Sequence, residues 1–477
     1  MTEISGDLLL KGGRLVTGRG VEECDILIKD GRIAAMAGSD SGAGTLTADE
    51  VLDITGLIVT QGFADLHVHF REPGYEYKET ILTGSQAAAA GGYTLVCPMP
   101  NLSPVPDSVE NLAVELEAVK RDAVIDVKPY ASITKGRKGL ELTDFAALKA
   151  GCAAFSDDGS GVQSESMMLA AMQAAAAEDV IIAAHCEDNS LLRGGYIHDG
   201  RWCAEHGHKG ICSESEWGQI KRDLDLCAQT GCRYHVCHIS CAESVALIRE
   251  AKSRGVRVTC ETGPHYLALC EDDMQEDGRF KMNPPLRSAA DRDALIEGLV
   301  DGTIDVIATD HAPHSAEEKS RGLAHSAMGI VGLETAFPVL YTSLVLTGRV
   351  SLTRLVEALT SAPRRIFGLG SDLAVGSPAD LTVIDLDARY TIDSSAFLSK
   401  GHSTPFDGTE VQGRILLTIK DGLVAFQASD SALQNFRFAS SHRCAPLAVP
   451  PFTGPRAAKV LSWQSLTLKV NTEQETN

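Results

Sequence analysis

Two histidines one residue apart, His67 and His69, end an apolar run in FADLHVHFREPG, residues 63–74. Residues i and i+2 of a strand point to the same face, so both imidazoles can reach one metal ion. Asp65 lies on the same face and is a candidate partner that orients one of the rings. The alternative is a pair of histidines with a purely structural role, because the motif is short.

Four further apolar runs also end in side chains that bind metals. FSDDGSG carries Asp157 and Asp158, AAHCED carries His185, HVCHIS carries His238, and IATDHAPH carries Asp310. Taken singly, each has a structural alternative: paired acids can form a turn that caps a helix, and a lone histidine after an apolar run is more often structural.

Taken together, four histidines, one bridging carboxylate and one terminal aspartate describe a two-metal hydrolytic centre. Imidazole-rich ligation favours zinc. His235 is a weaker candidate than His238 because it lies further back in its run. Asp310 closes the last run, where a general base would be needed.

The elements that must position these side chains alternate between strands and helices. Short apolar runs are each followed by a helical, Ala- and Glu-rich segment, which predicts a parallel (β/α)8 barrel with its active site at the C-terminal ends of the strands. A doubly wound open sheet is the second interpretation, but no GxGxxG follows the first run. The expected strands are 62–69, 93–100, 126–133, 152–158, 180–186, 233–239, 257–265 and 305–311.

Both ends of the chain differ from this middle part. Residues 1–60 and 366–430 contain short apolar runs separated by Gly- and Asp-containing turns, which predicts a small β-sandwich built from both chain ends. The barrel is expected over 61–365. From residue 431 to residue 477 the sequence predicts an irregular tail, to which no role is assigned.

The composition limits the kind of partner. The chain has 477 residues, of which 44% are hydrophobic and 22% charged, as in globular proteins. Its net charge of −21 argues against nucleic acid, which needs a basic surface, and favours small-molecule partners. The 13 cysteines lie in apolar runs and predict reduced thiols. We find no targeting or membrane-spanning segment, so a cytoplasmic location is expected.

In these motifs the chain resembles the amidohydrolase superfamily and, within it, the bacterial-type (type I) dihydroorotases. The resemblance covers about residues 8 to 427. Taken together the motifs are specific, although HxH alone is not. The matching stretches are DLHVHFREPG, GGYTLVCPMPN, FSDDG, AAHCED, YHVCHIS, KMNPPLR, ATDHAPH and LSKGHSTPF.

The resemblance assigns roles to the metal-binding candidates. It makes His67 and His69 ligands of one zinc ion, His185 and His238 ligands of a second, and Asp158 the bridge between them. Asp157 is the competing choice for the bridge. Many relatives use a carboxylated lysine there, and the absence of a lysine at this strand end favours the subgroup that bridges with aspartate.

The resemblance also implies a substrate and a reaction. Asp310 would be the acid/base in the reversible cyclisation of N-carbamoyl-aspartate to dihydroorotate, a step of pyrimidine synthesis. Arg71 would bind the substrate's carboxylate as a planar, bidentate donor. Further substrate contacts are implied for Asn101, His314, Asn283 and the backbone at Met328 and Gly329, where the family often has Phe-Gly.

Two alternatives stay open. Another cyclic amidohydrolase, such as a hydantoinase (dihydropyrimidinase) or an allantoinase, would not need Arg71 for a ring carboxylate. A non-catalytic barrel that acts as a scaffold for aspartate transcarbamoylase would be expected to have lost metal ligands, whereas all are present here. The family also makes a homodimer and an association with aspartate transcarbamoylase expectations to be tested.

Overall fold

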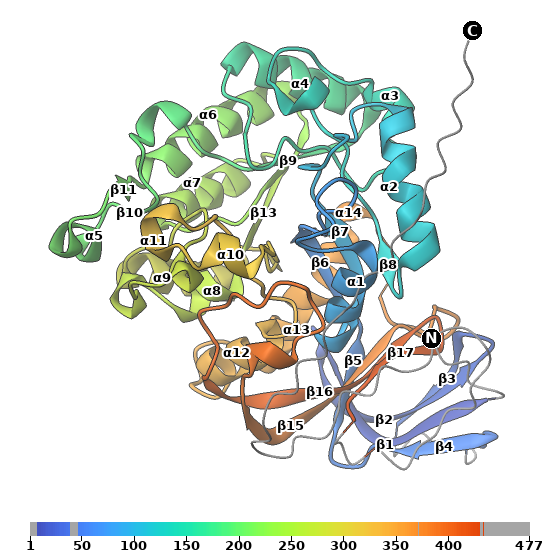
Figure 1. Cartoon of the computed structure of the whole chain (residues 1–477). Coiled ribbons are helices and arrows are strands. Elements are labelled where there is room, and N and C mark those ends of the chain that lie inside the picture. Colours follow the sequence, from blue (N-terminus) through green and yellow to red (C-terminus); the bar gives the residue numbers. More distant parts are fainter. Residues whose placement is uncertain (1–6, 39–45, 371, 430–432, 434–477) are drawn as a thin grey trace, which may run out of the picture.

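The computed structural model describes residues 7–38, 46–370, 372–429 and 433. It divides into a barrel of parallel strands with surrounding helices and a β-sheet that lies at one end of the molecule (Figure 1). The tail expected from residue 431 lies outside the described residues, except for Leu433, which is buried.

The barrel is closed by parallel pairing all the way round. Two parallel sheets, β6-β7-β8 and β9-β12-β13-β14, provide seven of its eight strand positions. Phe155 occupies the fourth position, because single parallel bridges join it to Ala131 on one side and to Ile182 on the other. A parallel bridge between Val68 and His311 joins the first position to the last and closes the barrel. The (β/α)8 architecture is therefore confirmed. The strands are β6 (Phe63–Val68), β7 (Tyr93–Pro98), β8 (Asp126–Val127), β9 (Ile181–Ala184), β12 (Arg233–Val236), β13 (Val258–Thr262) and β14 (Val306–Ile307).

Helices surround this barrel and pack apolar or small side chains against it (Figure 1). Ser or Thr side chains cap the first turns of several of them, as at Thr80, Ser108, Ser164, Ser288 and Ser351. The main helices are α1 (Ile81–Ala90), α2 (Val109–Asp122), α3 (Phe145–Leu148), α4 (Glu165–Glu178), α6 (Glu214–Thr230), α7 (Ala242–Ser253), α9 (Ala289–Asp301), α13 (Leu352–Leu359) and α14 (Ser361–Phe367).

Shorter elements decorate the loops of the barrel. After β9 the chain makes an excursion that projects from the barrel, with a two-stranded ribbon and α5 at its tip (Figure 1). In the labels of the short elements, η marks a 3-10 helix, except that η5 is a π-helix. The short elements of all the loops are η1 (Lys135–Arg137), η2 (Asn189–Leu191), β10 (Ile197–His198), α5 (Arg201–His206), β11 (Gly210–Ile211), α8 (Pro264–Ala268), η3 (Glu271–Asp273), η4 (Gly278–Phe280), α10 (Ala316–Lys319), α11 (Gly322–His325), α12 (Ala336–Leu340), η5 (Tyr341–Val345) and η6 (Ser394–Ala396).

The two chain ends form β structure together, as expected. Their strands are hydrogen-bonded into one continuous eight-stranded sheet in the order β17-β16-β15-β5-β1-β2-β3, with β4 paired to β1. Antiparallel pairing of β5 with β15, with Val59 opposite Val383, joins the two ends. The strands are β1 (Leu8–Thr17), β2 (Gly20–Lys29), β3 (Arg32–Ala37), β4 (Glu50–Asp53), β5 (Ile58–Gln61), β15 (Leu381–Thr391), β16 (Glu410–Lys420) and β17 (Leu423–Gln427).

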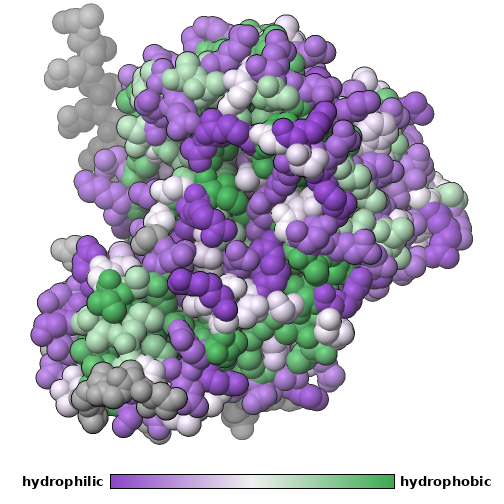
Figure 2. Space-filling model, turned by 180° about the vertical axis from the view of Figure 1, so that it is seen from behind, coloured by the Kyte–Doolittle hydropathy of each residue, from purple (hydrophilic) through white to green (hydrophobic). Residues whose placement is uncertain are grey.

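The sheet and the barrel have hydrophobic cores of their own. Side chains from both chain ends, such as Leu8, Ile26, Leu381 and Leu417, form the core of the sheet. On the face seen in Figure 2, hydrophilic residues cover most of the barrel. No helix among the described residues is long and apolar enough to span a membrane. The cysteines of the described residues are all free thiols, most of them buried.

Candidate metal centre and active site

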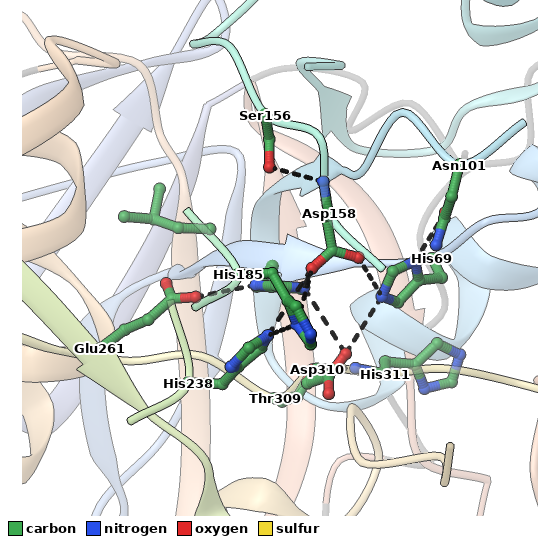
Figure 3. A network of polar contacts seen from close by, with 12 residues as sticks. His69, Asn101, Ser156, Asp158, His185, His238, Glu261, Thr309, Asp310 and His311 are labelled. Carbon is green, nitrogen blue, oxygen red and sulfur yellow. Dashed lines mark hydrogen bonds and ion pairs between the residues drawn. The ribbon is translucent and has the colours of Figure 1, made fainter. Parts of the chain in front are cut away.

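The histidines at the end of β6 point toward one carboxylate inside the barrel mouth (Figure 3). The His67 Nε2 atom lies 3.4 Å from Asp158 Oδ1, and the His69 Nε2 atom lies 3.6 Å from Asp158 Oδ2. All three side chains are buried. The alternation of a β-strand brings the two rings to the same face, as the HxH spacing predicts.

A second pair of histidines approaches Asp158 from the other side. The His185 Nδ1 atom lies 3.7 Å and the His238 Nε2 atom 3.6 Å from Asp158 Oδ1. Asp158 therefore belongs to two groups, His67–His69–Asp158 and Asp158–His185–His238, and in each group the candidate ligand atoms lie within 4.8 Å of one another. These five residues come from the ends of four different strands and meet only because the barrel closes.

The chemistry of this cluster fits a metal cofactor. His67 Nε2 and Asp158 Oδ1 are buried and have no hydrogen-bond partner among the described residues. Buried polar atoms are nearly always paired, so two such atoms facing each other indicate a ligand that bonds to both. Imidazole nitrogens with a carboxylate are a donor set that binds zinc and related divalent metals.

The two adjacent acids of FSDDG point in different directions. Asp157 Oδ1 accepts hydrogen bonds from the backbone N–H groups of Ile133, at 2.9 Å, and Thr134, at 3.0 Å. Its carboxylate is thus engaged with the preceding loop. Asp158 is the acid that faces the imidazoles, while its own backbone N–H donates to Ser156 Oγ at 3.0 Å. This geometry favours Asp158 over Asp157 as the bridging candidate.

The electrostatics of the cluster keep both of its inner carboxylates ionised. Burial alone would raise the pKa of Asp158, but the neighbouring imidazoles, His67 first, hold that pKa well below its usual range. Asp310 is in a similar position: burial opposes its ionisation, and the hydrogen bond from His69 and the imidazole charges lower its pKa. Both acids are therefore held as anions that can bind a cation.

Asp310 lies beside the first histidine pair. Its Oδ1 atom is 3.1 Å from His69 Nε2 and 3.6 Å from His67 Nε2. Its backbone is in the left-handed region, with a φ of 48°, and His238 and Arg71 also have positive φ values, of 34° and 61°. Such backbone conformations are uncommon for residues other than glycine and cluster at functional sites.

Glu261, at the end of β13, orients His67 of the cluster. Glu261 was not among the residues singled out in the sequence. Its Oε1 atom lies 2.9 Å from His67 Nδ1 and its Oε2 atom 3.1 Å from His235 Nε2. His235 Nδ1 in turn lies 2.8 Å from Thr259 Oγ1. A carboxylate on His67 Nδ1 holds the proton there and leaves the Nε2 lone pair for a metal. The signal for Glu261 was its place at a strand end, in TCETG.

Asp65 does not have the ring-orienting role considered for it. Its carboxylate accepts hydrogen bonds from the backbone N–H of His67, at 3.0 Å, and from Thr309 Oγ1, at 2.6 Å. It therefore joins the ends of β6 and β14, which carry His67 and Asp310. Burial raises the pKa of Asp65 to about 7.

Arg71 and His314 lie together beside the cluster. The Arg71 guanidinium is buried, its Nε–H donates to the Pro313 carbonyl at 3.3 Å, and its Nη2 atom lies 3.5 Å from His314 Nε2. Burial, followed by the charges of Arg71 and Lys78, lowers the pKa of His314 to about 3. The neutral ring donates from Nε2 to the Met328 carbonyl at 2.8 Å. A buried guanidinium next to a neutral imidazole is suited to a carboxylate ligand.

Two asparagines connect the cluster to the space beside it. Asn101 Oδ1 lies 2.8 Å from His69 Nδ1, so Asn101 orients that ring. Asn283 Nδ2 donates to Glu187 Oε1 at 2.9 Å, and Glu187 Oε2 lies 3.6 Å from His185 Nε2. Asn283 Oδ1 is buried without a partner among the described residues, which leaves an acceptor for a ligand N–H. Glu187, like Glu261, was not anticipated.

Met328 and Gly329 lie next to His314, but their backbone is already engaged. The Gly329 N–H donates to the Lys281 carbonyl at 3.1 Å, and the Met328 carbonyl accepts from His314. Gly329 has a φ of 134°, and a Cβ there would lie 2.6 Å from the Ala312 carbonyl oxygen, so glycine is required. The Gly329 N–H and the Met328 carbonyl thus each have a partner within the protein, and the substrate contact expected of this backbone stays a prediction.

Solved structures with the same architecture identify the class of protein. L-Hydantoinase (dihydropyrimidinase) from Arthrobacter aurescens superposes with a TM-score of 0.79 and 30% identity, covering 89% of this chain and 96% of that one. Dihydropyrimidinase from Brevibacillus agri NCHU1002 gives a TM-score of 0.76 at 23% identity, covering 88% and 94%, and this likeness shows the fold alone. Fold and histidine cluster together define an amidohydrolase-type (β/α)8 barrel.

Sequence comparison narrows the class to a family. A family model described as "Dihydro-orotase-like" matches residues 56–244. A protein named "Dihydroorotase" from Geobacillus sp. (strain WCH70) is 51% identical over 424 residues, covering 88% of this chain and 99% of that protein. A "Dihydroorotase" from Bacillus cereus (strain AH820) is 49% identical over 431 residues, covering 89% and 99%. This chain belongs to the dihydroorotase family.

Proposed function

We propose that the chain catalyses the reversible cyclisation of N-carbamoyl-L-aspartate to dihydroorotate, with two zinc ions. The observation that carries the proposal is a carboxylate, Asp158, placed between two pairs of histidines, with the buried guanidinium of Arg71 beside them. Identity of 49–51% to proteins named dihydroorotase over nearly their whole length supports the same reaction.

The cluster supports two metal positions. His67 and His69 would hold one ion, His185 and His238 the other, and Asp158 would bridge them. Two ions at this place would supply a Lewis acid for the ring carbonyl and activate a water molecule. Glu261 and Asn101, bonded to His67 Nδ1 and His69 Nδ1, fix the direction in which those rings present Nε2.

Asp310 moves the proton in this proposal. In ring opening its carboxylate accepts a proton from the attacking water and then delivers it to the leaving ring nitrogen. In ring closure it takes the proton from the ureido nitrogen and delivers it to the carboxylate oxygen that leaves as water. Ionisation of Asp310, favoured by the adjacent imidazoles, supplies the base that ring opening requires.

The remaining residues would recognise the substrate. Arg71 and Asn101 would bind its carboxylate together with His314, which would turn its Nε2–H from the Met328 carbonyl to the substrate. The Oδ1 atom of Asn283, which has no partner among the described residues, would accept from the ring amide. Arg71 separates this proposal from hydantoinase activity, because hydantoins have no ring carboxylate to bind. Met328 and Gly329 are proposed as neighbours of the pocket wall.

The test is an absorbance assay for dihydroorotate turnover, with hydantoin and allantoin as parallel substrates and metal content measured on the same preparation. We expect turnover of dihydroorotate far above that of the other two and about two zinc ions per chain. Preference for hydantoin or allantoin would assign the chain to another cyclic amidohydrolase. A protein that stays metal-free and inactive after zinc is supplied would favour the scaffold alternative.

The finer partner and location predictions rest on the family resemblance. A homodimer, an association with aspartate transcarbamoylase and a cytoplasmic location are the expectations. Light scattering of the purified chain, alone and mixed with aspartate transcarbamoylase, tests the first two. A monomer that does not bind the transcarbamoylase would contradict both.

A further inference from the structure

A buried lysine lies within the loop that carries the proposed substrate contacts. Lys319 is the last residue of α10, and it is only 6% exposed. Its ammonium group donates to three backbone carbonyls: Lys281 at 3.0 Å, Ala327 at 2.9 Å and Gly329 at 2.7 Å. An ammonium has three N–H bonds, so all of them are used. Among the described residues no carboxylate forms an ion pair with Lys319.

The three carbonyls belong to two different loops of the active site. Lys281 is two residues before Asn283, whose side chain contacts Glu187 beside the cluster. Ala327 and Gly329 flank Met328, whose carbonyl accepts from His314. The Lys319 ammonium therefore connects the loop of Asn283 to the loop against which His314 rests.

Lys319 also affects His314 through its charge. Burial is the largest cause of the low pKa of His314, followed by Arg71 and Lys78, and Lys319 adds to the effect. Each of these keeps the ring neutral, so that its single Nε2–H donates to Met328. The Lys319 side chain is thus linked to His314 in two ways: through its hydrogen bonds to the backbone on both sides of Met328, and through its charge.

Burial of the Lys319 ammonium costs free energy, and a residue that served only for packing would not need to carry this charge. Burial, followed by the charge of Lys281, lowers its pKa to about 7, while Asp277 acts in the opposite direction. The three carbonyl dipoles favour the ammonium form. A methionine would fill the same space without this cost, so the donors themselves are what the site requires.

Lys281 provides a matched comparison on the same loops. Its side chain is also buried, but its ammonium donates to the Ala324 carbonyl at 3.0 Å and lies 5.0 Å from the centre of the Tyr196 ring. It makes no side-chain contact with the 327–329 segment among the hydrogen bonds of the described residues. Loss of its charge should therefore leave His314 in place.

We propose that Lys319 is a positioning residue for substrate recognition: its three hydrogen bonds fix the 281–283 and 327–329 loops in one arrangement. In that arrangement Asn283 and His314 are held at a set separation for the ring amide and the carboxylate of one substrate molecule. This inference rests on the proposed function, in which these two residues bind dihydroorotate.

The experiment compares Lys319→Met with Lys281→Met in the zinc-loaded full chain, with dihydroorotate as substrate. For Lys319→Met we expect KM to rise about tenfold or more while kcat stays within about threefold and bound zinc is unchanged, because binding contacts and not the reacting groups are displaced. For Lys281→Met we expect KM to change by less than about threefold. Lys319→Arg, which keeps several donors, should recover part of the loss.

Several outcomes would overturn the inference. These are an unchanged KM in Lys319→Met, an equal rise of KM in Lys281→Met, or a joint loss of kcat and zinc with no change in KM. If Lys319→Met does not fold, Lys319→Gln, whose amide has two N–H donors, takes its place, and a wild-type KM in that variant would refute the proposal. An Arg71→Met variant with normal kinetics would instead count against the proposed function itself.

Discussion

Replacement of Arg71 by methionine tests the assignment of the substrate's carboxylate. The Arg71 guanidinium is buried, and its Nε–H is occupied by the Pro313 carbonyl at 3.3 Å, which leaves the outer nitrogens for a ligand. Removal of one partner from a buried, hydrogen-bonded charge pair costs about 3–5 kcal/mol. We therefore expect kcat/KM for dihydroorotate to fall roughly 10²- to 10⁴-fold.

The loss should appear mainly in KM, because the carboxylate does not react and is bound equally in the ground state and the transition state. Initial rates from the absorbance of dihydroorotate over a range of concentrations separate the two constants. Metal content should not change, since Arg71 is not a candidate ligand. Kinetics within a few-fold of wild type, or a fall in kcat and zinc at constant KM, would refute the reasoning.

Lys78→Met is the matched control for local charge. Lys78 lies 3.2 Å from His314 Nδ1 and 2.9 Å from Glu318 Oε1, so it is a cation in the same neighbourhood that is already paired. We expect a change in kcat/KM of less than about fivefold, equivalent to about 1 kcal/mol. An effect as large as that of Arg71→Met would show that net charge, and not the forked donor, binds the carboxylate.

Three further predictions concern the cluster and its surroundings. Asp310→Asn should lower kcat by about 10²- to 10⁴-fold with zinc retained, as expected for loss of a general acid/base, and near-normal turnover would contradict that role. Glu261→Gln should weaken zinc binding about 10- to 100-fold in chelator competition, because His67 loses its orienting charge, and an unchanged affinity would contradict it. Burial raises the pKa of Glu334 from 4.5 to about 8, so the neutral carboxyl stabilises the fold fully below about pH 4.5 and this contribution is lost as the pH rises toward 8. Glu334→Gln should therefore gain unfolding free energy relative to wild type between about pH 5 and pH 8 in urea titrations, and a difference that does not vary with pH would contradict the shift.

The barrel and the metal-binding candidates could be predicted from the sequence because the signal is local. Each apolar run has the length of a buried strand, and the polar residue that ends it lies where parallel strands meet. Strand four shows the limit of this signal, because in CAAFSDD the strand bridges to both neighbours are formed by Phe155 alone before the chain turns. Strand length could not be predicted, but the position of Asp158 at its end could.

Other features depend on contacts between distant parts of the chain. Glu261 lies 194 residues from His67, and its role follows from the register of β13 beside β12, which no local pattern reveals. Asp158 is favoured over Asp157 as the bridging candidate because hydrogen bonds from Ile133 and Thr134 engage Asp157, and these bonds join distant parts of the chain. In the sequence, Lys319 ends the polar run SAEEK, which is typical of an exposed helix, and its burial arises only when two loops close over it.

The most direct test of the two-metal centre is anomalous X-ray diffraction at the zinc edge from crystals of the zinc-loaded chain. Two anomalous peaks on either side of the Asp158 carboxylate are expected, one against His67 and His69 and the other against His185 and His238. A single peak, a bridge through Asp157, or zinc bound away from these histidines would contradict the proposed centre.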